Sequence, residues 1–252
     1  MNIVFDIDDT MYDLMEPFRR AHEKYFKDRT MADCARLFDR SRVYSDIILE
    51  QERQGVVKSH EAFYRRIQMT YQDVGINVTW DESDRFEQEY RRQQSLIRMF
   101  DFMRDTLDYC RREQILLAVL TNGNSNGQRK KAAVLELNKW FEDDRIFVTG
   151  EIGWHKPDVR AFRAVEEHTG FAPEDTWYVG DSYESDVEGA SRAGWHVIWL
   201  NHRRRPCPSA QNLSENELED GKELLRLIRQ KRMEEQGKTR IFEEKEKIKK
   251  SC

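Results

Sequence analysis

The chain has 252 residues, of which 35% are charged, and its formal net charge is −5. A chain of this length can bury one good hydrophobic core and carry a smaller second domain. The mildly acidic balance argues against a protein that binds nucleic acid. Because no apolar run is long enough to span a bilayer and the first residues lack signal-peptide features, we expect a cytoplasmic protein without a membrane partner. The cysteines lack metal-ligand spacing and are expected to be reduced thiols.

The first segment is a short apolar run that ends in two carboxylates. Residues 3–5 predict a buried strand, and Asp6 and Asp8 follow at its carboxyl end. In open α/β sheets, ligands bind just outside the carboxyl ends of the strands. A turn of the chain after Ile7 would bring both carboxylates into one pocket. Paired carboxylates in such a pocket suit a hard cation and an acid/base pair.

Strand signals then stop, and residues 14–98 are helical in character. Apolar side chains recur with a period of about 3.6, which predicts about four or five helices. We expect the last of them to be capped at Asp81 and to end near Arg92. This segment is predicted to form a helical domain inserted after the first strand. Its aromatic residues are expected to pack between the helices, and stacking on a base or sugar is the alternative for Tyr44, Phe63, Tyr64 and Tyr71.

From residue 99 onward, strand and helix patterns alternate. The predicted helices are 99–113, 125–138, 158–169 and 183–193, and the predicted strands are 115–120, 145–148, 175–179 and 195–200. This alternation predicts an α/β fold with a parallel, doubly wound sheet and right-handed crossovers. We therefore expect one core domain that combines residues 1–13 with residues 99–210.

The last part of the chain, residues 211–252, is predicted to form a helix on the core followed by a charged, solvated tail. The helix is expected to start at residues 212–215, and the chain is nearly all charge from Arg229 onward. A self-association helix or a docking site for an acidic partner are the alternatives. The arginines at 203–205 are expected to lie in a surface loop, and contact with a phosphate-rich substrate is the alternative.

Polar residues stand at or near the predicted strand ends in a recurring pattern. They are Asp6 and Asp8, Thr121 and Asn122, Lys156 before Pro157, and Asp181 and Asp186 after Gly180. In this order and spacing, residues 1 to about 201 resemble the haloacid dehalogenase (HAD) superfamily. The resemblance implies a Rossmann-like core, and the inserted helices match the helical C1 cap of that superfamily.

These residues can carry out the hydrolysis of a phosphate monoester. That reaction needs an in-line nucleophile, neutralisation of the phosphate oxygens and a proton for the leaving alcohol. Asp6 is the predicted nucleophile, which would form an aspartyl-phosphate, and Asp8 is the predicted general acid and base. Thr121 is predicted to hold the phosphate with neighbouring N–H groups, and Lys156 to offset negative charge.

The resemblance adds a metal and a choice of chemistry. It implies Mg²⁺ between the Asp6 carboxylate, the backbone carbonyl of Asp8 and Asp181, with Asp186 in the second shell. Asn122 is expected beside the phosphate or in the second shell. Family members that are dehalogenases lack an aspartate at the position of Asp8, because a halide leaving group needs no proton. The sequence therefore favours a Mg²⁺-dependent phosphatase.

The cap favours a small phosphorylated metabolite as substrate, because a cover excludes water and bulky partners. A phosphomutase could use the same core, and it would protect the aspartyl-phosphate from water. A non-catalytic binding or regulatory protein on the same scaffold is the alternative from another class. No oligomeric state is predicted.

Overall fold

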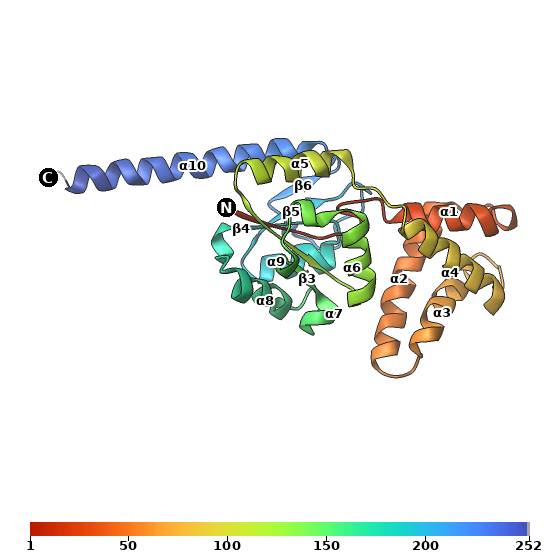
Figure 1. Cartoon of the computed structure of the whole chain (residues 1–252). Helices are drawn as coiled ribbons and strands as arrows, with labels where there is room; N and C mark the ends of the chain where they lie inside the picture. The colour runs from red at the N-terminus through yellow and green to blue at the C-terminus, as the bar shows by residue number, and fades with distance from the viewer. Residues whose placement is uncertain (251–252) are drawn as a thin grey trace. The chain divides into compact units, whose positions relative to one another are not determined.

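The computed structural model describes residues 1–250, apart from the side chains of Arg53, Ser59 and residues 238–250. The chain divides into two compact units. One unit combines Met1–Tyr12 with the chain from Arg98 onward, and the other is Asp13–Ile97. The first unit is an α/β domain, and the second consists of helices (Figure 1).

In the described part of the chain, the α/β unit contains a six-stranded sheet in the order β3-β2-β1-β4-β5-β6. All neighbouring strands are parallel. The strands are β1 (Asn2–Phe5), β2 (Leu116–Thr121), β3 (Ile146–Val148), β4 (Thr176–Gly180), β5 (His196–Leu200) and β6 (Asn216–Leu218). The predicted fold class, a parallel doubly wound sheet with an inserted helical domain, is confirmed.

Strand β1 occupies the point where the sheet reverses its order. The chain continues from β1 to β2 and β3 on one side, and it reaches β4, β5 and β6 on the other. Such a switch point leaves a crevice outside the carboxyl ends of the strands, where open α/β sheets bind their ligands. Asp6 directly follows β1 and Asp181 directly follows β4, so the topology brings both carboxylates to this crevice.

Helices cover both faces of the sheet (Figure 1). On one face, α8 (Val159–Thr169) and α9 (Glu188–Arg192) enclose a core that includes Phe162, Tyr178 and Trp199. On the other face lie α5 (Asp101–Arg112) and α10 (Glu223–Lys250), and the ammonium of Lys231 in α10 lies 5.0 Å from the ring centre of Trp177. Because side chains alternate along a strand, neighbours such as Trp177 and Tyr178 bind helices on opposite faces.

The C-terminal part of the α/β unit differs from the prediction. The prediction that a helix starts at residues 212–215 is wrong. This segment leads into the short strand β6, and α10 begins only at Glu223. Leu218 belongs to β6, where it pairs with Leu200 of β5. A three-residue strand carries no periodic signal of its own, so its formation depends on the sheet edge that it joins.

The helical unit contains α1 (Met15–Tyr25), α2 (Cys34–Arg53), α3 (Ser59–Gln72) and α4 (Trp80–Gln94). Aromatic rings form its centre: the rings of Phe26 and Tyr71 lie 4.3 Å apart, and Phe86 contacts both. Tyr71 is fully buried, which confirms the packing prediction for that residue.

The N-terminal cap of α4 also differs from the prediction. Asp81 is not the cap; Thr79 is, and it forms a capping box with Glu82. The threonine hydroxyl accepts a hydrogen bond from the Glu82 amide, and the glutamate side chain accepts one from the Thr79 amide. The threonine–glutamate pair satisfies two free N–H groups at once, which an aspartate inside the first turn cannot do.

Within the described residues, no helix combines the length and the apolar character that a membrane span requires. Cys34, Cys110 and Cys207 are free thiols. Burial raises the pKa of Cys110 to about 12, so its thiolate is disfavoured at neutral pH. Cys252 lies outside the described residues.

Candidate active site

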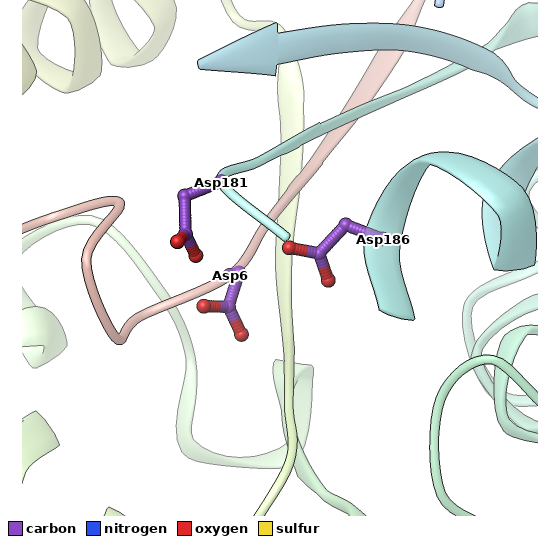
Figure 2. A group of neighbouring side chains, drawn as sticks. All are labelled: Asp6, Asp181 and Asp186. Atoms are coloured by element: carbon purple, nitrogen blue, oxygen red, sulfur yellow. The ribbon is translucent and has the colours of Figure 1, made fainter. Parts of the chain in front are cut away.

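Three carboxylates meet at the switch point of the sheet. Asp6 follows β1, Asp181 follows β4, and Asp186 lies in the π-helical turn Tyr183–Val187 (Figure 2). One oxygen of each carboxylate lies within 4.8 Å of the others. Burial and the neighbouring carboxylates raise the pKa of Asp6 to about 7, and they raise the pKa of Asp181 well above its usual value. The chain therefore concentrates negative charge where water is largely excluded.

Gly180 allows Asp186 to reach this cluster. A Cβ atom at position 180 would lie 2.3 Å from Oδ2 of Asp186, so any other residue would displace the carboxylate. That same oxygen accepts a hydrogen bond of 3.0 Å from the backbone N–H of Ser182. The glycine that ends β4 and the turn after it thus fix the direction of the Asp186 side chain.

Lys156 supplies the positive charge of the cluster. Its ammonium donates hydrogen bonds to Asp6 (2.8 Å), to Asp186 (2.6 Å) and to the hydroxyl of Tyr178 (2.7 Å). The Lys156 side chain is only 2% exposed. Burial alone would lower the pKa of Lys156, but the carboxylates of Asp186 and Asp6 outweigh burial and raise it above its usual value. A buried ammonium is stable only with such partners.

The donor set fits a divalent cation. Lys156 contacts Asp6 and Asp186, and Arg205 contacts Asp181, so three carboxylates face two cationic side chains and an excess of negative charge remains. Carboxylate oxygens are the ligands that Mg²⁺ prefers, and a bound cation would offset the repulsion that raises the pKa of Asp6 and Asp181. Asp6, Asp181 and Asp186 are thus suited to hold Mg²⁺.

The basic segment 203–205 contacts the site instead of lying free on the surface. Arg203 forms a two-pronged ion pair with the carboxylate of Asp9, and Nη1 of Arg205 lies 3.2 Å from Oδ2 of Asp181. The segment is a loop in which Arg204 is largely exposed, whereas Arg203 and Arg205 pair with carboxylates of the site. Arg203 and Arg205 offset the buried negative charge of Asp9. The backbone of Asp9 is in the left-handed region, with a φ of 60°.

Asp8 has its own set of partners. The ammonium of Lys131 lies 2.6 Å from each carboxylate oxygen, Gln128 donates a hydrogen bond of 3.0 Å, and Tyr12 donates one of 2.6 Å. Burial would raise the pKa of Asp8, but the charge and hydrogen bonds of Lys131 lower it to about 2. Asp6 and Asp8 are therefore neutralised by two different lysines.

Thr121 and Asn122, at the end of β2, differ in their contacts. The hydroxyl of Thr121 is fully buried and has no hydrogen-bond partner among the residues that the structure describes. The side chain of Asn122 makes two hydrogen bonds with the backbone of Lys156, at 2.9 and 3.0 Å. Asn122 thus fixes the loop that carries Lys156, whereas the Thr121 hydroxyl is left without a partner in the described part of the chain.

A family model for haloacid dehalogenase-like hydrolases matches residues 1–194. The chain belongs to this family. The resemblance predicted from the polar residues at the strand ends is therefore confirmed, and so is the prediction of a hydrolase from the HAD superfamily. The matched range contains all of the predicted site residues, including the carboxylate cluster and Lys156.

Phosphatases are among the relatives of this HAD hydrolase. It is 40% identical to phosphoserine phosphatase of Thermus thermophilus over 96 residues, which is 38% of each chain. The match to glyceraldehyde 3-phosphate phosphatase of Methanopyrus kandleri is 23% identical and covers 90% of this chain and 97% of that one. These relatives support the prediction that the chain is a phosphoric monoester hydrolase.

Solved structures share the fold of this HAD hydrolase. The HAD-hydrolase YfnB of Bacillus subtilis, in a structure bound to magnesium, has a TM-score of 0.67 and is 24% identical. The comparison covers 90% of this chain and 97% of that one. At this identity, the likeness extends to the architecture of the core and the inserted helices.

The sequence interpretation missed three residues of this HAD hydrolase that contact the predicted site residues. Gln128 and Lys131 are three positions apart, so they lie on one face of α6 (Ser125–Val134), and this spacing was a usable signal. Tyr178 lies inside a fully buried strand and gave no signal. Of the predicted residues, Asp6 and Asp186 both accept hydrogen bonds from Lys156, and an oxygen of Asp181 lies within 4.8 Å of those two carboxylates. Asp8 is linked to Lys156 through Gln128 and Asn122.

Proposed function

We propose that this hydrolase cleaves phosphate monoesters of small metabolites through an aspartyl-phosphate on Asp6, with Mg²⁺ as its cofactor. The observation that carries the proposal is the buried contact of Lys156 with Asp6, next to the end of β2, where the Thr121 hydroxyl has no hydrogen-bond partner within the described part of the chain. A carboxylate nucleophile must be relieved of charge before it can approach a phosphate dianion. The Lys156 ammonium, 2.8 Å from Asp6, provides part of that relief.

Each remaining group has a proposed task. Thr121 and the N–H groups that follow β2 bind the phosphate oxygens. Asp8 is the proposed general acid and base. It would give a proton to the leaving alcohol, which requires its ion pair with Lys131 to open first, and its ionised carboxylate would later take a proton from the water that cleaves the aspartyl-phosphate. Asp6, Asp181 and the backbone carbonyl of Asp8 would hold the cation, with Asp186 beside them, and Mg²⁺ would supply further charge neutralisation when bound.

The relatives favour a small substrate. The proteins named above act on phosphoserine and on glyceraldehyde 3-phosphate, according to their names, and the YfnB structure contains magnesium. The inserted unit Asp13–Ile97 is proposed to act as a cap, which would favour substrates small enough to be enclosed.

The test is phosphate release from a panel of sugar phosphates, nucleoside monophosphates, phosphoserine and p-nitrophenyl phosphate, with Mg²⁺ and with EDTA. We expect release that requires Mg²⁺ and that Asp6→Asn lowers by at least about 10³-fold, because the covalent intermediate can no longer form. The matched control is Asp101→Asn, at an aspartate whose side chain is 94% exposed. Mass spectrometry of quenched enzyme should detect an added phosphoryl group in the wild type only.

Two outcomes would contradict the proposal. Turnover of Asp6→Asn within tenfold of the wild type would exclude Asp6 as nucleophile. Absence of phosphate release from every substrate, with a folded wild-type protein, would remove the phosphatase and leave a mutase or a binding function.

A further inference from the structure

Arg205 places a positive charge against one carboxylate of the cluster. Its Nη1 atom lies 3.2 Å from Oδ2 of Asp181, and its Nη2 atom lies 3.8 Å from Oδ2 of Asp9. Asp181 directly follows β4, and Arg205 lies in the loop after the neighbouring strand β5. Residues that follow adjacent parallel strands meet at the same edge of the sheet, so the topology brings this arginine to the carboxylate.

Arg205 is more exposed than the other cations that pair with these carboxylates. Its side chain is 36% exposed, compared with 18% for Arg203 and 2% for Lys156. Asp9 keeps a counter-charge without Arg205, because Arg203 forms a two-pronged ion pair with it. A partly exposed guanidinium gives up an ion pair for water at little cost, whereas a buried ammonium does not.

The backbone contacts of this region do not depend on the Arg205 side chain. The side chain of Asn201 accepts a hydrogen bond from the Arg205 N–H and donates one to the Arg205 carbonyl, both at 2.8 Å. The indole N–H of Trp199 donates a hydrogen bond of 2.8 Å to the backbone carbonyl of Asp181. A change of the Arg205 side chain should therefore leave both the loop and Asp181 in place.

A divalent cation at the cluster and the guanidinium of Arg205 would interact with the same carboxylate. Like charges a few ångströms apart repel each other, and the repulsion is stronger where water is partly excluded. We propose that Arg205 opposes the binding of the cation: it offsets Asp181 when no cation is bound and gives up this ion pair when one binds. The inference rests on the part of the proposed function that assigns Mg²⁺ to the cluster.

The test is the affinity for Mg²⁺, measured by isothermal titration calorimetry at constant ionic strength. Arg205→Gln removes the charge but keeps an N–H donor, and we expect its Kd for Mg²⁺ to be about 10-fold lower than that of the wild type. Arg205→Met, a second neutral variant, should change the Kd in the same direction. Arg205→Lys keeps the charge and should bind Mg²⁺ more weakly than either neutral variant. Arg204→Gln, at a side chain that is 76% exposed, is the matched control and should bind like the wild type.

Thermal unfolding distinguishes competition from a purely structural role. In EDTA, Arg205→Gln should melt a few degrees below the wild type, because the Asp181 carboxylate has lost its ion pair. In saturating Mg²⁺ this difference should shrink, because the cation offsets Asp181 in both proteins. An arginine that only held the loop would contribute the same stability under both conditions.

The outcomes separate this inference from the function on which it rests. Tighter Mg²⁺ binding by the neutral variants, with a stability loss confined to EDTA, would support it. Unchanged or weaker Mg²⁺ binding by folded Arg205→Gln would overturn the opposition while leaving the cation site and the phosphatase intact. A wild type that binds no Mg²⁺ would overturn both the inference and the metal assignment. Phosphate release is measured separately, so a failure of the phosphatase alone would leave the change in Mg²⁺ affinity visible.

Discussion

At the scale of single residues, the carboxylates of the site are paired with cationic side chains from distant parts of the chain. Lys156 serves Asp6 and Asp186, Lys131 serves Asp8, and Arg203 serves Asp9. An unpaired charge in such a place would cost several kcal/mol, so removal of one partner has a larger effect than the pair's net contribution. Tyr178 is an uncharged part of this network. Its hydroxyl accepts a hydrogen bond from the Lys156 ammonium and donates one of 2.7 Å to the backbone carbonyl of Leu120.

Tyr178→Phe tests how much the tyrosine hydroxyl stabilises the fold. The change leaves the ring in place, but the Leu120 carbonyl loses its donor and Lys156 loses an acceptor. We expect the free energy of unfolding to fall by about 1–3 kcal/mol, measured by urea denaturation. Tyr64→Phe is the control, because Tyr64 is half-buried and its hydroxyl accepts a hydrogen bond from the side chain of Gln68, not from a buried charge. Unchanged stability of Tyr178→Phe would contradict the role of the hydroxyl.

At the scale of elements, short local signals decide where helices begin, while ion pairs join them. Helix α4 begins with the capping box of Thr79 and Glu82. Further along α4, the nearly buried carboxylate of Glu89 accepts from Lys24 of α1 and from Arg92 and Gln93, each at 2.6 Å. Hydrogen bonds from Arg92 and Lys24 lower the pKa of Glu89 from 4.5 to about 2.

The lowered pKa of Glu89 predicts a pH dependence of stability. A carboxylate with a depressed folded-state pKa stabilises fully above its unfolded-state pKa, and that stabilisation is lost as pH falls through its folded-state pKa. We expect Glu89→Gln to lower the melting temperature by a few degrees at pH 7, and the gap to the wild type to narrow between pH 4.5 and about 2. Thermal unfolding followed by circular dichroism at a series of pH values measures the difference in melting temperature between the variant and the wild type. Glu87→Gln, at a pair with Arg91 within one helix, should have a smaller effect. A gap that widens at low pH would contradict the assignment.

At the scale of the whole molecule, the fold assembles a cluster of three carboxylates that the unfolded chain lacks. Asp6 follows β1 near the start of the chain, whereas Asp181 and Asp186 follow β4, and the switch point of the sheet brings them together (Figure 2). A ligand that binds only the folded chain stabilises it by mass action.

Mg²⁺ should therefore raise the melting temperature of the wild type relative to EDTA. At a Mg²⁺ concentration of 100 times Kd, the stabilisation is about 2.7 kcal/mol. Asp181→Asn should abolish most of this shift, because it removes a ligand and part of the excess negative charge. NaCl at matched ionic strength controls for screening. Identical melting curves in Mg²⁺ and EDTA would exclude a cation site of useful affinity.

By itself, the sequence determined the parallel α/β core, the helical insertion and the polar residues at the strand ends. These features depend on local patterns: apolar runs predict buried strands, and a chemical group at a strand end lies at the same edge of a parallel sheet as the others. The predicted strands agree with β2, β3, β4 and β5 to within one residue at each end. The carboxylates and Lys156 could be found for the same reason.

Only the tertiary structure decided which residues support the reacting groups. Lys131 contacts a carboxylate 123 positions away, and Arg203 one 194 positions away. Tyr178 lies within an apolar strand, and β6 is too short to show a period, so neither carries a local signal. Such contacts arise because the order of the strands brings distant segments together, and no pattern within a single segment encodes that order.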